Sequence, residues 1–323
     1  MRTHRGPTLC ATLWLCSAAM AAAAQTWPAK PVRMIVPYPP GGVADITARI
    51  YSPRLVEAWS QSVLIDNRPG ANGAIGAELA ARSAPDGYTL LMATASEITI
   101  NPTFYPKLGY EPVRDFAPIS LASNNPVVLV TNATTTIRTL ADLVAQGKAR
   151  PDTLAFGTPG SGSLHHLTVE QFRLLGGPLL VHVPYKGGGP AAAAVVGGET
   201  PLAAVALAPA LPHLRSGRIR GLALASAKRS SLAPEVPTFT ESGFAIEASN
   251  WVGLLAPAGT PPWLVARVNQ DMSRAAQTAE VRDRFAQAGG EVASSTPAEF
   301  AALIKADIVK LAKVVRAANV KPE

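Results

Sequence analysis

Strand-like and helix-like segments alternate along this chain, and that order constrains its fold more than any other feature. Apolar, β-branched segments at 32–36, 63–66 and 88–92 predict strands, and amphipathic segments at 45–59 and 73–83 predict helices between them. Consecutive parallel strands need crossover connections, so this β-α-β-α-β order predicts a parallel sheet flanked by helices. Pro53 lies inside the first predicted helix and predicts a kink there.

The same alternation restarts after Asn124-Asn125-Pro126. It predicts a second α/β lobe, with strands at 127–130, 153–156, 181–183 and 219–225 and helices at 140–146, 163–175 and 190–196.

The C-terminal stretch is helical again and returns to the first lobe. One predicted apolar face carries Leu264, Val268 and Met272, and another carries Phe300, Ile304, Ile308 and Leu311. We therefore expect one lobe to comprise 25–124 and 249–323, and the other to comprise 125–248. Two lobes joined by crossings near 124 and 248 are typical of a hinge that closes on a ligand.

The first 24 residues have the pattern of a secretory signal peptide. Two arginines within the first five residues precede an apolar run at 9–20, and Ala22-Ala23-Ala24 then precedes Gln25. The alternative is a membrane anchor, but the apolar run is shorter than the ~20 residues that a spanning helix needs. We expect export to the periplasm and a mature chain that begins at Gln25.

Both cysteines, Cys10 and Cys16, lie in this leader. A lipoprotein signal is not favoured, because Leu15 precedes Cys16 where a small residue is needed. The mature chain then has no disulfide, thiol nucleophile or cysteine metal site. An exported fold without disulfides must rest on a large apolar core, which this length can bury.

The charge distribution argues against a nucleic-acid partner. Removal of Arg2 and Arg5 with the leader lowers the formal net charge from +7 to +5, and the remaining basic residues form no run. A mildly positive field favours an anionic solute, although ordinary solubility explains this charge equally well. Beyond the leader, no stretch reaches membrane-spanning length without Pro, Gly or a charge.

Signatures of common enzymes are absent from the sequence. It contains no G-x-S-x-G elbow, no phosphate-binding loop and no H-E-x-x-H motif. His165 and His166 are adjacent on a predicted helix, so they point about 100° apart and cannot share a metal from one face. We expect no catalysis, no cofactor and no metal. A periplasmic hydrolase that uses Ser161 or Ser163 is the alternative.

Three glycine-rich loops each connect a predicted strand to a predicted helix. Such loops lie at the carboxyl ends of parallel strands, where ligands bind, and lead into helix N-termini with free N–H groups and a positive dipole end. Glycine allows an anion to approach those groups closely. Ordinary turn and cap chemistry is the alternative for any single loop. The candidate residues are Tyr38, Pro39, Pro40, Gly41 and Gly42; Gly160, Ser161, Gly162 and Ser163; and Tyr185, Lys186, Gly187 and Gly188.

Four further side chains complete the candidate site. Thr94 and Ser96 follow a strand end and could offer hydroxyls, and His165 begins the helix after the second loop. Asp45 either stabilises the first turn of its helix or binds an amino group of the ligand. Trp251 could form part of a cleft wall, but a core position is favoured.

Seven ordered motifs carry a family resemblance across essentially the whole mature chain. They resemble those of tripartite tricarboxylate transporter receptors, also called Bug proteins. The motifs lie at 37–42 with Asp45, 67–73, 84–90, 160–163 with His166-Leu167, 182–187, 234–238 and 256–261.

The resemblance implies a two-lobed Venus-flytrap α/β fold of the periplasmic-binding-protein type, each lobe a mainly parallel sheet flanked by helices. It implies capture of small mono-, di- or tricarboxylates by backbone amides and ordered waters in the three loops. It also implies a partner permease with one large and one small membrane subunit. A ligand sensor for a signalling partner is an alternative, and we expect a monomer.

Three departures from the family pattern affect the pocket and the last helix. The family often has an acid within 191–194, Phe-Asp at 204–205 and a tryptophan at 311. This chain has four alanines, Ala204-Val205 and Leu311 there. The first two changes predict a roomier or more apolar pocket in the second lobe.

Overall fold

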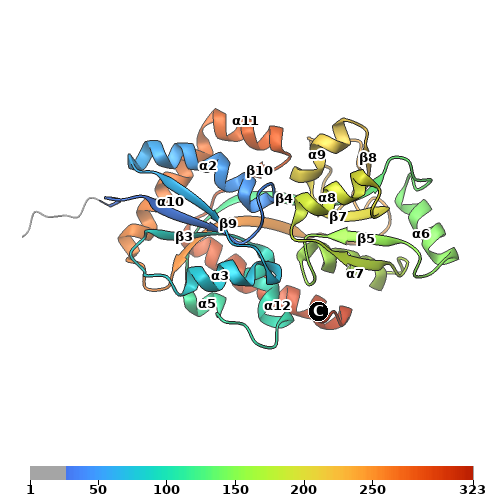
Figure 1. Ribbon diagram of the computed structural model, residues 1–323, viewed down its shortest axis with the longest axis horizontal. Coiled ribbons are helices and arrows are strands. Elements are labelled where there is room, and N and C mark those ends of the chain that lie inside the picture. The colour runs from blue at the N-terminus through green and yellow to red at the C-terminus, as the bar shows by residue number, and fades with distance from the viewer. Residues whose placement is uncertain (1–26, 323) are drawn as a thin grey trace, which may run out of the picture.

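Two long strands cross the molecule from one half to the other. In the computed structural model, which describes residues 27–322, β4 (Phe116–Asn132) and β9 (Ser249–Pro257) run antiparallel and join two α/β halves (Figure 1). The crossing predicted near 124 lies within β4, and the one predicted near 248 comes just before β9 begins. The lobe boundaries themselves stay a prediction, and the predicted leader lies outside the described residues.

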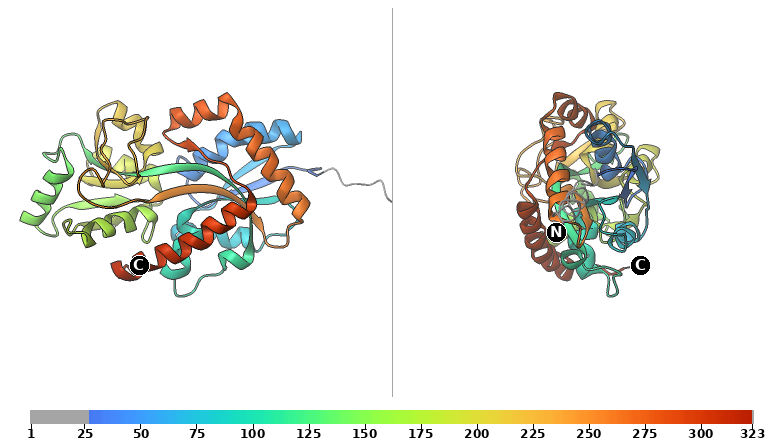
Figure 2. Two further views of the ribbon diagram at one scale, coloured as in Figure 1. Left: turned by 180° about the vertical axis from the view of Figure 1, so that it is seen from behind. Right: turned by 90° about the vertical axis from the view of Figure 1, so that its left-hand side faces the viewer.

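The first half is built on the strand order β2-β1-β3-β9-β4. The first three strands are parallel, as predicted, whereas β9 joins β3 antiparallel and a short β10 pairs antiparallel with β4. One face carries α2, α10 and α11, and the other carries α3 and α12 (Figures 1 and 2). The bounds are β1 (Val32–Val36), β2 (Val63–Asn67), β3 (Thr89–Thr94), β10 (Glu291–Val292), α2 (Val43–Trp59), α3 (Ala74–Ala81), α10 (Pro262–Gln277), α11 (Ala279–Ala288) and α12 (Pro297–Ala318).

The second half continues the sheet from β4 through β7, β5 and β6, with β8 paired to β4 as well. β7, β5 and β6 are parallel, and both β7 and β8 are antiparallel to β4. Each half is therefore a mixed sheet, because the crossing strands join the parallel ones antiparallel. The bounds are β5 (Ala155–Thr158), β6 (Val181–Pro184), β7 (Leu202–Ala206), β8 (Ile219–Leu224), α6 (Leu140–Ala149), α7 (Leu164–Leu174), α8 (Gly188–Gly197) and α9 (Leu207–Arg215).

Strand β7 and helix α9 are two elements that the sequence pattern did not predict. Every residue of β7 is buried, and α9 buries Leu207, Ala208, Ala210 and Leu211. A strand that is covered on both faces is apolar throughout, so it has no alternation to detect. Short helical segments also join the main elements, namely Ala71–Gly73, Ser96–Ile100, α4 (Asn101–Phe104) and α5 (Pro112–Asp115).

The apolar faces predicted for the C-terminal helices are confirmed. Leu264, Val268 and Met272 are buried in one core with β1, and Phe300 and Ile304 are buried in another. No helix in the described part of the chain combines the length and apolar character needed to cross a membrane.

Trp251 belongs to the core, as favoured from the sequence. Its side chain is 1% exposed and its ring packs edge-on against Phe300, with 5.1 Å between centroids. Its indole N–H donates a hydrogen bond of 2.8 Å to Oδ2 of Asp307 on α12. This contact anchors α12 to the crossing strand β9.

Candidate ligand-binding site

The first and third glycine-rich loops touch each other across the two halves. A Cβ built on Gly187 would lie 3.0 Å from Cδ of Pro39, and one built on Gly189 would lie 3.6 Å from the carbonyl oxygen of Gly41. Gly187 has φ +125°, a conformation that other residues rarely adopt. Because Gly187 and Gly189 have no side chain, the two halves can meet at these loops.

A small cavity of about 20 Å³ lies between the halves. Seven predicted residues line it: Tyr38, Gly42, Thr94, Ser96, Ser163, His165 and Gly188. Five more line it that the sequence did not single out as site residues: Val43, Pro159, Ala206, Pro209 and Asn250. A volume of this size accommodates about one water molecule.

A second hollow of about 240 Å³ adjoins the cavity, since both are lined by Tyr38 and Pro159. Five further predicted residues line this groove: Pro39, Gly160, Ser161, Tyr185 and Lys186. Neither space is lined by the remaining predicted residues, which are Pro40, Gly41, Asp45, Gly162 and Gly187.

Helix N-termini surround the small cavity. Helices α2, α8 and α9 begin there with Gly42, Gly187 and Ala206 as N-caps, and none of these residues forms a side-chain cap. The start of α7 also reaches it, although Ser163 Oγ caps the amide of His166. First-turn N–H groups and the helix dipoles make this a positive environment, although the described lining residues include no Lys or Arg.

Several backbone amides of the predicted loops already donate hydrogen bonds to acceptors within the protein. Gly41 N–H donates to Asp45, Gly42 N–H to the Pro39 carbonyl, and Gly162 N–H to Nδ1 of His166. In a tight turn such as that at Gly41, with φ +82°, the backbone N–H groups lie close to hydrogen-bond acceptors of the same loop. In α7 the first-turn amides of Leu164 and His166 donate to the hydroxyls of Ser96 and Ser163, so the N–H groups left for an anion are mainly those in the first turns of α2, α8 and α9.

Asp45 shapes the first loop. It is 2% exposed, and its carboxylate accepts hydrogen bonds from Gly41 N–H at 3.0 Å, Arg49 Nε at 2.9 Å and Asn67 Nδ2 at 3.0 Å. Burial raises the pKa of Asp45, but these hydrogen bonds outweigh burial and hold the pKa below its ordinary value. The geometry supports the structural alternative for this residue.

Glu97 is a buried carboxylic acid directly behind the cavity. Its Oε2 accepts hydrogen bonds from the Tyr38 hydroxyl at 3.0 Å and the Thr94 hydroxyl at 2.5 Å, and its Oε1 accepts from the Thr94 amide at 2.5 Å. Burial raises the pKa of Glu97 to about 7. The sequence reasoning missed it, although an acid one residue after Ser96 was the available signal.

Asn250 and His165 form a polar pair on the cavity wall. Asn250 lies on β9, and its Nδ2 is 3.5 Å from Nε2 of His165 on α7. Both side chains are at least nine-tenths buried, and Oδ1 of Asn250 and Nδ1 of His165 have no partner among the described residues. Burial lowers the pKa of His165 to about 3, so its ring is neutral at physiological pH.

His166 supports the second loop and does not line the cavity. Its ring stacks on His182 with 3.7 Å between centroids, and its Nδ1 accepts the Gly162 amide. Within residues 27–322 no group of three or more His, Cys, Asp or Glu side chains is arranged to hold a metal ion.

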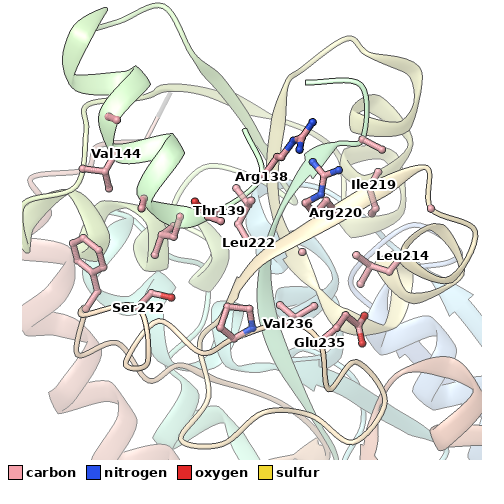
Figure 3. Close-up of a pocket in the computed structure, with 18 residues that line it drawn as sticks. Arg138, Thr139, Val144, Leu214, Ile219, Arg220, Leu222, Glu235, Val236 and Ser242 are labelled. Atoms are coloured by element: carbon pink, nitrogen blue, oxygen red, sulfur yellow. The ribbon is translucent and has the colours of Figure 1, made fainter. Parts of the chain in front are cut away.

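A much larger hollow lies elsewhere, at the outer end of the second half. Its volume is about 910 Å³, and α6, β8 and the segment 235–244 surround it, with Arg138 and Arg220 on one side (Figure 3). Its lining is mostly apolar and includes none of the predicted site residues. We therefore assign the candidate site to the space between the halves.

Comparison with known proteins places the chain in a family. A family model described as tripartite tricarboxylate transporter family receptor matches residues 47–320. The chain belongs to this receptor family. The receptor is similar to BugT of Bordetella pertussis, with 38% identity over 313 residues and 96% of each chain covered. The family and the functional class predicted from sequence, a periplasmic solute-binding receptor, are confirmed.

Two solved structures extend this likeness to the fold. The receptor is similar to the R. palustris protein Rpa4515 with adipate, at 32% identity and a TM-score of 0.89, over 92% of this chain and 100% of that one. It is also similar to MatC from Rhodopseudomonas palustris with bound malate, at 30% identity and a TM-score of 0.85, over 90% and 100%. The predicted periplasmic-binding-protein fold is confirmed.

Proposed function

We propose that this receptor captures a small organic carboxylate and presents it to a transporter without chemical change. The observation that carries the proposal is the meeting of four helix N-termini, α2 from one half and α7, α8 and α9 from the other, at one cavity. An anion gains from first-turn N–H groups and from the dipole ends without an arginine partner. Relatives solved with adipate and malate have the same fold.

Ligand entry requires the halves to separate. A cavity of about 20 Å³ is too small for an organic acid, so we propose that the lobes 25–124 with 249–323 and 125–248 open about the crossing strands β4 and β9. The direct approach of Gly187 to Pro39 is then a contact of the closed form.

The wider assignment follows the family. We propose a monomer that is exported with cleavage before Gln25, has no nucleic-acid partner, and delivers its ligand to one large and one small membrane subunit. A sensor that docks on a signalling protein would use the same closure. A hydrolase that uses Ser161 or Ser163 would release product from esters, and a turnover assay separates it from a receptor.

A ligand screen tests the proposal. Native mass spectrometry of the protein as purified, followed by thermal shift with mono-, di- and tricarboxylic acids, should identify a stabilising anion. Ligand at 100 times its Kd should add about 2.7 kcal/mol to the free energy of unfolding. Stabilisation by neutral or cationic solutes, with none by any carboxylate, would show that the proposal is wrong.

A further inference from the structure

The hollow at the outer end of the second half lies beside an open edge of the sheet. Four consecutive residues of β8, from Ile219 to Leu222, line it, with α6 on one side and the end of α9 and segment 235–237 on the other. Among the strands of the described chain, β8 pairs with β4 alone. Its other edge is covered near Leu224, which forms an isolated bridge with Thr238. The four lining residues therefore border the hollow with a free strand edge.

The backbone groups of Ile219 and Gly221 point away from β4. The Arg218 carbonyl accepts a hydrogen bond of 3.1 Å from Ala133 N–H at the end of the β4 pairing, and the direction of these groups alternates along a strand. The backbone groups of Arg220 therefore face β4, and those of Ile219 and Gly221 face the hollow. In the described part of the chain, no hydrogen bond outside the β4 ladder involves these two backbones. Unpaired N–H and C=O groups on a strand edge are a template for another strand.

Apolar side chains from both faces of the sheet line the hollow. Leu140 and Leu222 belong to the core on the α6 side of the sheet. Ile219 and Val236 belong to the core on the α9 side. The hollow therefore lies beyond the edge of the sheet, between its two covering layers. A strand added to β8 would place its alternate side chains against these two layers.

The hollow carries more positive than negative charge. Arg138 and Arg220 lie on one side of it, and Glu235 is the one acid among the described lining residues (Figure 3). Arg220 donates through Nη1 to the Ile137 carbonyl at 3.2 Å, which leaves most of its guanidinium donors unused. Asp142 accepts the backbone N–H of Arg138 at 3.0 Å. No ion pair in the described part of the chain involves either arginine.

An acidic strand would use the free edge, the apolar layers and the arginines together. A small amphipathic anion would leave the strand edge unpaired. A second copy of this chain, added edge to edge through β8, would bring Arg138 and Arg220 of both copies together, and like charges on adjacent strands are destabilising. We propose that the hollow binds an extended, acidic segment of another protein, which adds to β8 as a further strand. This inference concerns a surface outside the cleft and goes beyond the proposed function.

Labelled peptides test the inference on the full receptor. The probe is a peptide of about eight residues, alternately aspartate and valine and capped at both ends, whose affinity is measured by fluorescence anisotropy. One control peptide has lysine in place of aspartate. The other is the acidic peptide with every amide N-methylated, which removes its ladder donors. The acidic peptide should bind saturably, and each control should bind at least about tenfold more weakly.

Charge changes in the receptor locate the binding surface. Arg138→Glu should weaken binding of the acidic peptide at least about tenfold, and Lys148→Glu, the matched control, should leave the affinity within about threefold. Both positions are exposed and both changes alter the net charge equally, but Lys148 lies at the other end of α6 and does not line the hollow. Ala141 is exposed and lines the hollow, so Ala141→Glu should weaken binding and Ala141→Lys should not. Thermal melting checks that each variant folds.

Four results would overturn the inference. The first is the absence of saturable binding by the acidic peptide. The second is equal binding by its N-methylated form, with displacement by decanoate, which would identify a site for a small amphipathic anion. The third is equal weakening by Arg138→Glu and Lys148→Glu, which would indicate general charge attraction. The fourth is a dimer in sedimentation that Arg138→Glu strengthens, which would make a second copy the occupant. Carboxylate binding in the cleft is measured separately and is unaffected by each of these results.

Discussion

The carboxylate of Asp45 accepts a hydrogen bond of 3.0 Å from the backbone N–H of Gly41, four residues earlier in the chain. This bond closes the first glycine-rich loop and leads directly into α2. It also removes the Gly41 amide from the set that could bind a ligand. The acid thus acts on the site through the shape of the loop.

Asp45→Ala should therefore reduce both stability and binding. The change leaves Gly41 N–H without its acceptor and leaves Asn67 Nδ2 with the Tyr38 carbonyl alone, which should lower the free energy of unfolding by about 1.5–3 kcal/mol. The loosened loop should weaken carboxylate binding at least tenfold in calorimetry. Asp271→Ala is the control, because Asp271 is 4% exposed and accepts from Trp59 Nε1 at 3.0 Å away from the cleft. Equal loss of affinity in both variants would contradict a specific role for Asp45.

Glu97→Gln should change how stability depends on pH. Burial raises the pKa of Glu97 from 4.5 to about 7, so between these values the folded protein keeps a proton that the unfolded chain has lost. The Glu97 contribution to stability is therefore largest below pH 4.5 and falls as pH rises to 7. Relative to wild type, the variant should gain on the order of 3 kcal/mol between pH 4.5 and 7.5.

Urea denaturation of wild type and Glu97→Gln at several pH values measures this gain. The difference between the two unfolding free energies at each pH cancels the titration of other groups. These include His165 and His166, whose pKa values burial lowers to about 3 in both proteins. A difference in unfolding free energy that stays constant from pH 4.5 to 7.5 would show that Glu97 does not titrate in this window.

Gly189→Val should hinder closure of the two halves. A Cβ at Gly189 already lies 3.6 Å from the Gly41 carbonyl, so the valine methyls would press against the first loop. Gly197→Val lies on the same helix with no atom near its Cβ position. Scattering with saturating ligand should show a smaller radius of gyration for wild type and Gly197→Val than for Gly189→Val. Identical closure in all three would argue against this contact as part of the closed form.

Gly41→Val should weaken binding severely through strain in the backbone. Gly41 has φ +82°, which a β-branched residue tolerates poorly, although nothing lies within 4 Å of its Cβ position. Gly176→Val carries a similar strain, at φ +99° beyond the end of α7, and should keep its affinity. Calorimetry of the two variants separates loop distortion from a general loss of stability.

Lys186→Met should lower affinity by less than about tenfold. Lys186 is exposed and lines the groove rather than the small cavity, so it adds a screened charge and not a buried ion pair. Truncation of one partner of a buried charge pair would cost about 2 kcal/mol or more. Loss of all binding in Lys186→Met, with Gly41→Val tolerated, would favour a charge pair over helix N-termini.

Much of the fold could be predicted because its signals are local. The β-branched runs became β1, β2 and β3, and the apolar face with Leu264 became part of α10. The glycine-rich loops were recognisable because left-handed turns and close backbone approach need glycine wherever they occur. Among the missed elements, β7 is buried at every residue and so shows no alternation, and α9 contains Pro209 and Pro212, which are unfavourable helix signals in a sequence.

The same distinction between local and long-range information applies to the candidate site. By itself, the sequence determined the family, the alternation of strands and helices, and the loops that flank the cavity, because each of these is encoded in neighbouring residues. Only the tertiary structure decided which groups are free to bind. It placed Glu97 behind Tyr38, 59 positions earlier, and brought Asn250 to His165 across 85 positions of the chain. Hydrogen bonds between residues so distant in sequence leave no periodic pattern, since only the tertiary fold brings their atoms into range.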